Sequence, residues 1–250
     1  MPQVFPKSMN SLARVVVIGV PLLMGGTGAA IGAFYRSDYT TSRNEIVEQP
    51  VPFSHLHHVS QLGIDCRYCH TPVESSAYAT IPPTKTCMNC HMQMWVGAEL
   101  LDPVRTSWTT NVPIQWTKVH NVPHYTYFNH SIHVAKGVGC YSCHGRIDQM
   151  SLVFQSKTLL MEWCLNCHRA PENHLRPKSE VFNIAWTPGT EAVTERTTEN
   201  GKTVDRKYST VDTDGEKIPP MSQAELGRYL KEKYHVRDAT PLTSCSICHR

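Results

Sequence analysis

Five C-x-x-C-H motifs account for all ten cysteines of this chain. The thiols are those of Cys66, Cys69, Cys87, Cys90, Cys140, Cys143, Cys164, Cys167, Cys245 and Cys248. The histidines that end the motifs are His70, His91, His144, His168 and His249. This spacing is the attachment signature of c-type haem, in which two thiols add to the porphyrin vinyl groups and the adjacent histidine becomes the proximal iron ligand. The sequence therefore predicts five covalently attached haem c groups.

Other uses of paired cysteines explain this pattern less well. A disulfide framework would not place a histidine after every second cysteine. Zinc sites join C-x-x-C pairs two at a time, and five pairs leave one over. A thioredoxin-like redox pair needs a βαβ pattern, which the sequence lacks. Five motifs with no spare cysteine thus favour haem.

The rest of the composition predicts a thin conventional core. The chain has 250 residues and 17 prolines, and long periodic apolar segments are few after residue 36. We therefore expect a mostly irregular fold with short α-helices, organised around the haems. The formal net charge of +3 excludes the cofactors, whose propionates would add up to about ten negative charges. No basic run indicates nucleic-acid binding.

One segment near the N-terminus is suited to a membrane. Residues 15–35 contain no charged side chain, and a helix of this length spans about 30 Å, the thickness of a bilayer core. A cleaved signal peptide is the alternative, but the apolar stretch is long for one. Gly28 and Gly32 give this helix a small face that favours packing against a partner helix. Because haem c is attached outside the bacterial cytoplasm, we expect a single-pass inner-membrane anchor with the haem domain in the periplasm.

A repeat precedes two of the haem motifs. Residues 53–58 and 128–133 both read F-x-H-x-x-H, and each is followed by a glycine-containing loop and two C-x-x-C-H motifs. A low-spin haem iron needs a second axial ligand, and a second imidazole closes the site to everything except electron transfer. Histidines three residues apart share a helix face but diverge, so they can serve different haems. The predicted distal ligands are His55, His58, His130 and His133.

The fifth distal ligand is harder to assign, because nine of the 14 histidines lie outside the haem motifs. We select His120 and interpret His124 as a loop residue. His57 is expected to neighbour ligands, and His174 and His235 to face solvent. A methionine thioether could replace one imidazole. Met150 and Met221 are candidates, although core packing or a loop contact explains them better.

The chain divides into four segments by these patterns. Residues 1–36 form the anchor, and residues 37–187 form a four-haem region built from two two-haem repeats. Residues 188–220 are polar and contain Asn200-Gly201, a two-residue turn signal that predicts a hairpin or loop. Residues 221–250 hold the fifth haem site, preceded by an amphipathic helix at residues 223–236.

Longer strings carry a family resemblance. Each repeat resembles the cytochrome c3 and c7 families. The strings GIDCRYCHTPVE, IPPTKTCMNCH, PIQWTKVHNVP, YFNHSIHVAKGVGCYSCHGRIDQM and WCLNCHRAPENHLRP, together with the terminal LTSCSICHR, resemble the pentahaem, membrane-anchored cytochrome c subunit of alternative complex III. Residues 188–219 match no motif of that family.

This resemblance implies an electron-transfer subunit that is not an enzyme by itself. Alternative complex III is a quinol:acceptor oxidoreductase. The implied partners are an iron–sulfur subunit, quinol-binding membrane subunits, a mono-haem cytochrome and an electron acceptor. A self-sufficient membrane quinol dehydrogenase or a cytochrome c3-type carrier is the alternative. A pentahaem nitrite reductase is disfavoured, because its C-x-x-C-K motif is missing.

Overall fold

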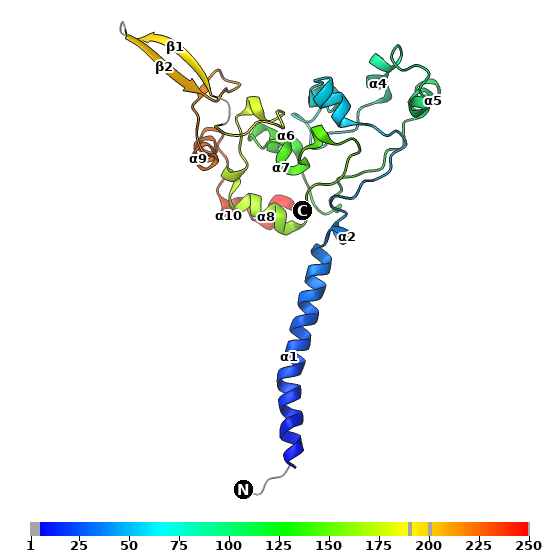
Figure 1. Ribbon diagram of the computed structural model, residues 1–250, viewed down its shortest axis with the longest axis vertical. Coiled ribbons are helices and arrows are strands. Elements are labelled where there is room, and N and C mark those ends of the chain that lie inside the picture. Colours follow the sequence, from blue (N-terminus) through cyan, green and yellow to red (C-terminus); the bar gives the residue numbers. More distant parts are fainter. Residues whose placement is uncertain (1–5, 190–191, 200–201, 250) are drawn as a thin grey trace. The chain divides into compact units, whose positions relative to one another are not determined.

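The N-terminal helix α1 (Lys7–Arg36) begins eight residues before the uncharged stretch and ends one residue after it. The computed structural model describes residues 6–189, 192–199 and 202–249. With 30 residues, α1 is about 45 Å long at about 1.5 Å per residue. None of its residues is buried, and it is long and apolar enough to cross a membrane (Figure 1). The chain separates into two compact units, Met1–Arg43 and Asn44–Arg250.

The first unit ends in a short cap after α1. Ser37 terminates the helix with its backbone N–H and its hydroxyl on the carbonyl of Phe34. Helix α2 (Asp38–Thr41) follows. Arg43 closes the turn by donating to Asp38 over 2.6 Å. These local bonds satisfy the last backbone groups of the helix end.

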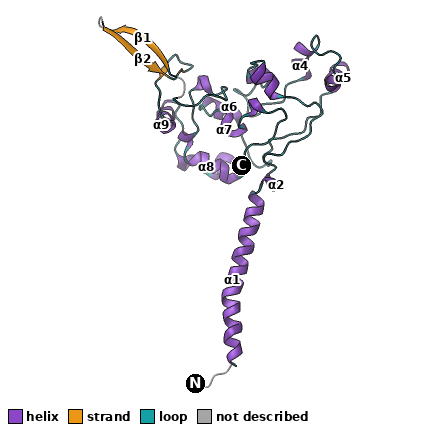
Figure 2. Cartoon of the chain, viewed as in Figure 1, coloured by secondary structure: helices purple, strands orange, loops and turns teal. Residues whose placement is uncertain are grey.

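The second unit consists mainly of loops that connect short helices (Figure 2). Its α-helices are α3 (Cys66–Cys69), α4 (Thr84–His91), α5 (Asp102–Thr110), α6 (His130–Ala135), α7 (Cys140–His144), α8 (Met161–Arg169), α9 (Gln223–Lys233), α10 (Ala239–Leu242) and α11 (Cys245–Cys248). A π-helix, η1 (Leu56–Gln61), and four 3-10 helices complete the helical segments: η2 (Glu99–Leu101), η3 (Ile147–Gln149), η4 (Pro171–Asn173) and η5 (Lys178–Glu180). The structure is thus mostly helical and irregular, as the composition predicts.

Two small antiparallel sheets interrupt the helices. Strand β1 (Val193–Glu199) pairs with β2 (Lys202–Tyr208), in register from Val193 opposite Tyr208 to Glu199 opposite Lys202. This pairing lies along the segment for which the sequence predicts a hairpin, and its two turn residues, 200 and 201, fall outside the described residues. Strands β3 (Thr210–Val211) and β4 (Lys217–Ile218) form the second sheet.

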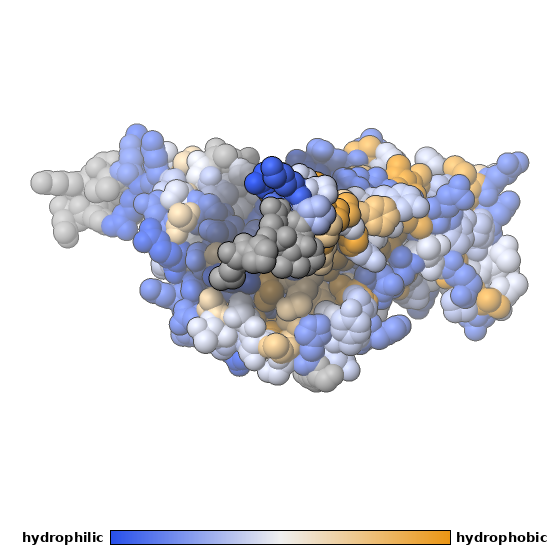
Figure 3. Space-filling view, turned by 90° about the horizontal axis from the view of Figure 1, so that it is seen from below, coloured by the Kyte–Doolittle hydropathy of each residue, from blue (hydrophilic) through white to orange (hydrophobic). Residues whose placement is uncertain are grey.

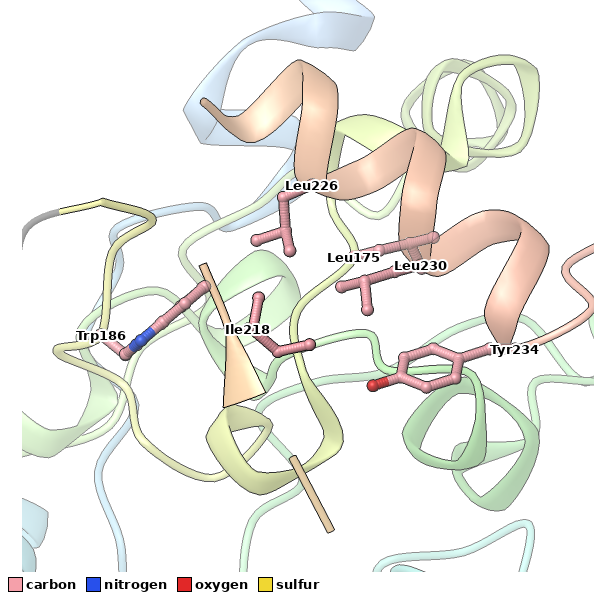
Figure 4. Packing of buried hydrophobic residues seen from close by; sticks show 6 residues of the cluster. All are labelled: Leu175, Trp186, Ile218, Leu226, Leu230 and Tyr234. Carbon is pink, nitrogen blue, oxygen red and sulfur yellow. The ribbon is translucent and has the colours of Figure 1, made fainter. Parts of the chain in front are cut away.

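Helix α9 carries the largest apolar cluster of the second unit. Its start is fixed by a capping box between Ser222 and Glu225. The cluster consists of Leu175, Trp186, Ile218, Leu226, Leu230 and Tyr234, which converge from several segments in Figure 4. A smaller cluster joins Val51, Met88 and Val104 beside α4 and α5.

Few other residues of the second unit are buried and apolar. The described residues include 13 buried hydrophobic side chains, all after residue 43, and eight of them follow residue 174. Figure 3 shows hydrophilic residues on the side that carries the hairpin and scattered apolar residues toward α4 and α5. Trp95, Val96 and Leu100 are each at least 55% exposed on that side. The region of the C-x-x-C-H motifs therefore has little core of its own.

Candidate haem sites

Each C-x-x-C-H motif lies on a short helix. Helices α3, α7 and α11 begin at the first cysteine of a motif, whereas α4 and α8 begin three residues earlier. Positions three apart lie on one helix face, so each turn presents its two sulfurs on the same side. At the first motif the Asp65 side chain caps the helix by accepting a hydrogen bond from the N–H of Arg67. The local structure thus fits attachment to a flat porphyrin.

Four of the five motif histidines are oriented by carbonyl groups, whereas Nδ1 of His144 is buried without a hydrogen-bond partner. Nδ1 of His70 lies 2.7 Å from the carbonyl oxygen of Thr80, and Nδ1 of His168 lies 2.8 Å from that of Leu242. His91 and His249 make longer contacts of the same kind, with Met94 and Tyr125. A carbonyl accepts only, so Nδ1 carries the proton and Nε2 keeps its lone pair for a metal. These four imidazoles are therefore held in the tautomer that an iron ligand needs.

The two F-x-H-x-x-H segments share several contacts, although the first leads into a π-helix and the second into an α-helix. The second histidine of each bonds through Nδ1 to the carbonyl four residues earlier, at 2.8 Å for His58 and 2.6 Å for His133. Phe53 stacks on His58 at 4.4 Å between ring centroids, and Phe128 stacks on His133 at 4.6 Å.

The same two phenylalanines meet the first histidine of each segment edge-on, at 4.9 Å and 4.8 Å between ring centroids. Sequence reasoning treated phenylalanine only as a repeat marker. Its presence in both copies was the signal that its ring orients both imidazoles.

Three pairs of histidine rings lie at nearly equal distances, two of them with nearly parallel ring planes and the third inclined by 63°. The ring centroids of His58 and His91 are 6.2 Å apart, those of His133 and His168 are 6.3 Å apart, and those of His130 and His144 are 6.5 Å apart. Two imidazoles on opposite sides of one iron have centroids roughly 6 Å apart, because a metal–nitrogen bond measures about 2.0 Å and the nitrogen lies about 1.1 Å from its ring centre. Each pair joins an F-x-H-x-x-H histidine to a motif histidine, with space for an iron.

Another distal candidate, His120, lies beside the pair formed by His130 and His144. Its ring centroid is 4.4 Å from that of His144, too close for an iron between them. Its Nε2 is buried and has no hydrogen-bond partner among the described residues. The sequence selected His120 as the fifth distal ligand, and the structure places it beside the third motif.

Burial favours the neutral form of two of these imidazoles, those of His55 and His144. Burial, together with the neighbouring rings of His70, His58 and His120, lowers the pKa of His55 to about 4. Burial likewise lowers the pKa of His144 to about 3, with His120 and His130 adding to the effect. Neutral imidazole is the form that binds metal.

Burial has the opposite effect on the pKa of two cysteine thiols, and it again favours the neutral form. Burial raises the pKa of both Cys140 and Cys143 to about 12.

The fifth motif is tied to the segment before the second repeat. Nδ1 of His249 lies 3.1 Å from the carbonyl oxygen of Tyr125, and the Tyr125 ring lies 5.7 Å from the His249 ring. The N–H of Tyr127 also donates to the carbonyl of Cys248 over 2.8 Å. These contacts fix the proximal side of the site. Among the described histidines, none has a ring contact with His249 like the three pairs above.

The remaining histidines and methionines considered in the sequence lie outside the three ring pairs. His124 and His235 are exposed, and His235 follows the end of α9 with a positive φ of 51° rather than continuing the helix. His174 was expected to face solvent but is half-buried, because it lines a cavity behind α7.

His57 stacks on Trp95 and bonds to Gln61, beside but outside the pairs. Met221 packs against the cluster under α9, and Met150 is buried, with its carbonyl bonded to the N–H of Leu56.

The donor set fits haem better than a bare metal ion. All ten cysteines are free of disulfides. Within residues 6–189, 192–199 and 202–249, no three side chains of His, Cys, Asp or Glu gather as a protein-only metal site requires. An iron held in a porphyrin needs only two axial ligands from the chain, a number that one ring pair could provide.

Comparison with known proteins supports the same conclusion. The chain matches no protein-family model. Over 153 residues it is 28% identical to the multihaem cytochrome c subunit of menaquinone reductase from Nitratidesulfovibrio vulgaris strain Hildenborough, and the match covers 51% of this chain and 70% of that protein. Together, the repeated attachment motifs and this similarity indicate a multihaem cytochrome c with covalently bound haem c.

Proposed function

We propose that the chain is a membrane-anchored pentahaem c-type cytochrome that transfers electrons within a quinol:acceptor oxidoreductase of the alternative complex III type. The observation that carries this proposal is the set of three imidazole pairs at 6.2–6.5 Å. They bring together residues that lie far apart in the sequence. Each distal ring also belongs to a repeat whose geometry recurs.

The imidazole pairs favour electron transfer over catalysis at the iron. Haem c supplies one-electron oxidation and reduction when it is bound. A histidine on each side of the iron leaves no coordination position for a substrate. His58, His130 and His133 would be the distal ligands opposite His91, His144 and His168. His55, whose pKa is lowered in part by the nearby His70, is our candidate for the distal ligand of the first haem.

A link to quinone rests on two observations. The N. vulgaris relative is a subunit of a menaquinone reductase. Helix α1 could cross a membrane, and Gly25 and Gly28 on it have no neighbouring atom within 4 Å of an added Cβ, which leaves room for a partner helix. We therefore infer membrane partners that exchange electrons with quinone, and a haem domain on the periplasmic side. An iron–sulfur subunit and a mono-haem cytochrome are the partners that the family resemblance implies.

The direction of electron flow has a second candidate. The relative's name describes quinone reduction, whereas the family resemblance implies quinol oxidation. The same ligand arrangement would serve either direction, because the potentials of the partners decide the direction of flow. In the second reading the chain would deliver electrons to a quinone-reducing membrane subunit.

Two experiments test the proposal. Intact mass spectrometry of the mature protein should show five covalently bound haems, and any smaller number would contradict the pentahaem assignment. Haem reduction by a quinol, followed in the α-band, should be fast in the purified assembly and slow in the isolated chain. Equally fast reduction of the isolated chain would favour a self-sufficient quinol dehydrogenase. Reduction by a periplasmic donor with delivery to quinone would support the reverse direction.

A further inference from the structure

A cavity lies behind the third haem motif. It has a volume of about 260 Å³ and is lined in part by Tyr141 and Ser142 of α7. These two residues stand between Cys140 and Cys143. Because the cysteines share one face of the turn, the residues between them lie on other faces. The cavity is therefore separated from the porphyrin side of the motif by α7 itself.

The main charge in the cavity wall is that of Arg176, which is 8% exposed. Its guanidinium lies over the rings of Tyr141 and Trp186, at 5.5 Å and 5.7 Å from their centroids. Its Nη1 donates to the carbonyl of Asn183 over 2.8 Å. A guanidinium has five N–H donors, so this bond leaves others available. The side chain is fixed in place but not saturated with acceptors.

The absence of a side chain at Gly139 allows Arg176 to pack against the haem motif. A Cβ added to Gly139 would lie 2.7 Å from Cδ and 2.8 Å from Nε of Arg176. Any other residue just before Cys140 would therefore displace the arginine side chain. The packing of Arg176 beside the attachment helix is thus built into the sequence at two positions.

Lys157 adds a second positive charge to the wall, whereas burial and the charge of Lys157 lower the pKa of His174 and favour its neutral form. Lys157 and His174 line the cavity, and none of its lining residues is Asp or Glu. The acidic side chain whose charge acts on Arg176 is that of Glu180. Its two carboxylate oxygens accept hydrogen bonds from Asn183 and Thr210 instead. A buried cation without a carboxylate partner is costly, and a bound anion would remove that cost.

We propose that this cavity binds a small oxyanion such as inorganic phosphate. Arg176 and Lys157 would hold its charge, and the side chains of Ser142 and Asn173 on the wall supply neutral donors. The volume is well above the roughly 10–15 Å³ that one water needs, so a hydrated oxyanion fits. A negative charge on this side of α7 would lower the potential of the haem attached to Cys140 and Cys143. The site would thus tune one haem without touching its iron.

The test uses the full-length holoprotein and inorganic phosphate. Calorimetric titration should show saturable binding, and redox titration should show the midpoint of one haem falling as phosphate is added. Lys157→Gln should weaken binding at least tenfold, because it removes one of two cations. Lys118→Gln, at an exposed position outside the cavity, should bind phosphate as the unmodified protein does.

Three outcomes would overturn the proposal. They are an absence of saturable binding, equal affinity in the Lys157 and Lys118 variants, or a shift spread evenly over all haems. The visible spectrum of each variant checks that its haems remain attached and ligated. If Lys157→Gln fails this check, Arg176→Lys provides a second variant, in which the charge stays but the fork-shaped donor set is lost. Phosphate affinity that this variant leaves unchanged would also contradict the site.

Discussion

Two regions of the second unit are organised by different means. From Phe53 to His168 the chain is held by short helices, carbonyl-bound imidazoles and stacked phenylalanines, with few buried apolar side chains. From Leu175 to Tyr234 it packs a conventional cluster around α9 (Figure 4). The first region contains paired histidine rings and few buried apolar side chains around them. The second region buries an apolar cluster of its own side chains. This difference agrees with the expectation that haems would supply the core of the first region.

The electrostatics of the two regions differ in the same way. In the first region, burial lowers the pKa of the His144 imidazole and raises that of the Cys140 thiol, so both favour their neutral forms. In the second region, a buried carboxylate is paired with a cation. Asp212 is 3% exposed and accepts from Nζ of Lys233 over 2.8 Å and from the hydroxyl of Tyr234 over 2.5 Å. Changes in the two regions should therefore have separable effects.

The largest effect should follow from removing a distal imidazole. In His133→Ala, the iron ligated by His168 should lose its second ligand and convert fully from low spin to high spin. Electron paramagnetic resonance of the oxidised holoprotein measures this conversion. His124→Ala, in an exposed loop, is the matched control and should leave every haem low spin. A low-spin spectrum in both variants would show that His133 is not a ligand.

A substitution that creates a cavity under α9 should destabilise the second region and leave the haem spectra unchanged. Leu230 is fully buried in the cluster, so Leu230→Ala should cost about 2–5 kcal/mol of unfolding free energy. Denaturant unfolding followed by tryptophan fluorescence reports it, because Trp186 belongs to the same cluster. Leu62→Ala, at a side chain that is 53% exposed, should cost far less. Altered haem spectra in Leu230→Ala would mean that the two regions are not separable.

Overpacking at the contact between α9 and η4 should be somewhat milder. A Cβ on Gly227 would lie 1.9 Å from the carbonyl oxygen of Glu172, so the helix would have to move away. We expect Gly227→Ala to cost about 1–3 kcal/mol of unfolding free energy, measured as before. Gly97→Ala, where no atom lies within 4 Å of the added Cβ, is the control. Equal stabilities for the two variants would contradict the packing of α9 on η4.

The smallest effect concerns acid stability. Burial raises the pKa of Asp212, but the hydrogen bonds from Lys233 and Tyr234 outweigh burial and hold it below its usual range. A carboxyl with a lowered native pKa contributes stability above its unfolded pKa of about 3.9, and that contribution is lost as pH falls through the native value. Each unit of lowering corresponds to about 1.4 kcal/mol.

The comparison that isolates this effect is Asp212→Asn. Stability measured from about pH 6 to about pH 2 should fall less steeply in Asp212→Asn than in the unmodified protein, since the variant has no proton to bind there. Asp238→Asn, at a side chain that is 85% exposed, should keep the original slope. Parallel curves for Asp212→Asn and the unmodified protein would show that the buried pair does not control acid stability.

Local patterns made much of this structure predictable. The apolar stretch at residues 15–35 forms a helix, the Asn-Gly signal lies between paired strands, and a capping box starts α9. The repeat of F-x-H-x-x-H indicated equivalent geometry because identical spacing places the same groups on a short helical turn.

Long-range contacts were not predictable in this way. His168 is oriented by the carbonyl of Leu242, which lies 74 residues away, and His249 by that of Tyr125, which lies 124 residues away. No sequence pattern marks a carbonyl as an acceptor, because every residue has one. The sequence also could not show that His120 lies beside His144, or that His174 is half-buried behind α7, because both depend on how distant segments pack together.

The most direct test of the central claim is near-infrared magnetic circular dichroism of the oxidised full-length holoprotein, because this spectrum distinguishes bis-histidine haem from histidine–methionine and high-spin haem. The account predicts bis-histidine signals from at least three haems, the ones that the pairs at His91, His144 and His168 would ligate. One of these signals should disappear in each of His58→Ala, His130→Ala and His133→Ala. A spectrum dominated by histidine–methionine or high-spin haem, or one that these three substitutions leave unchanged, would contradict it.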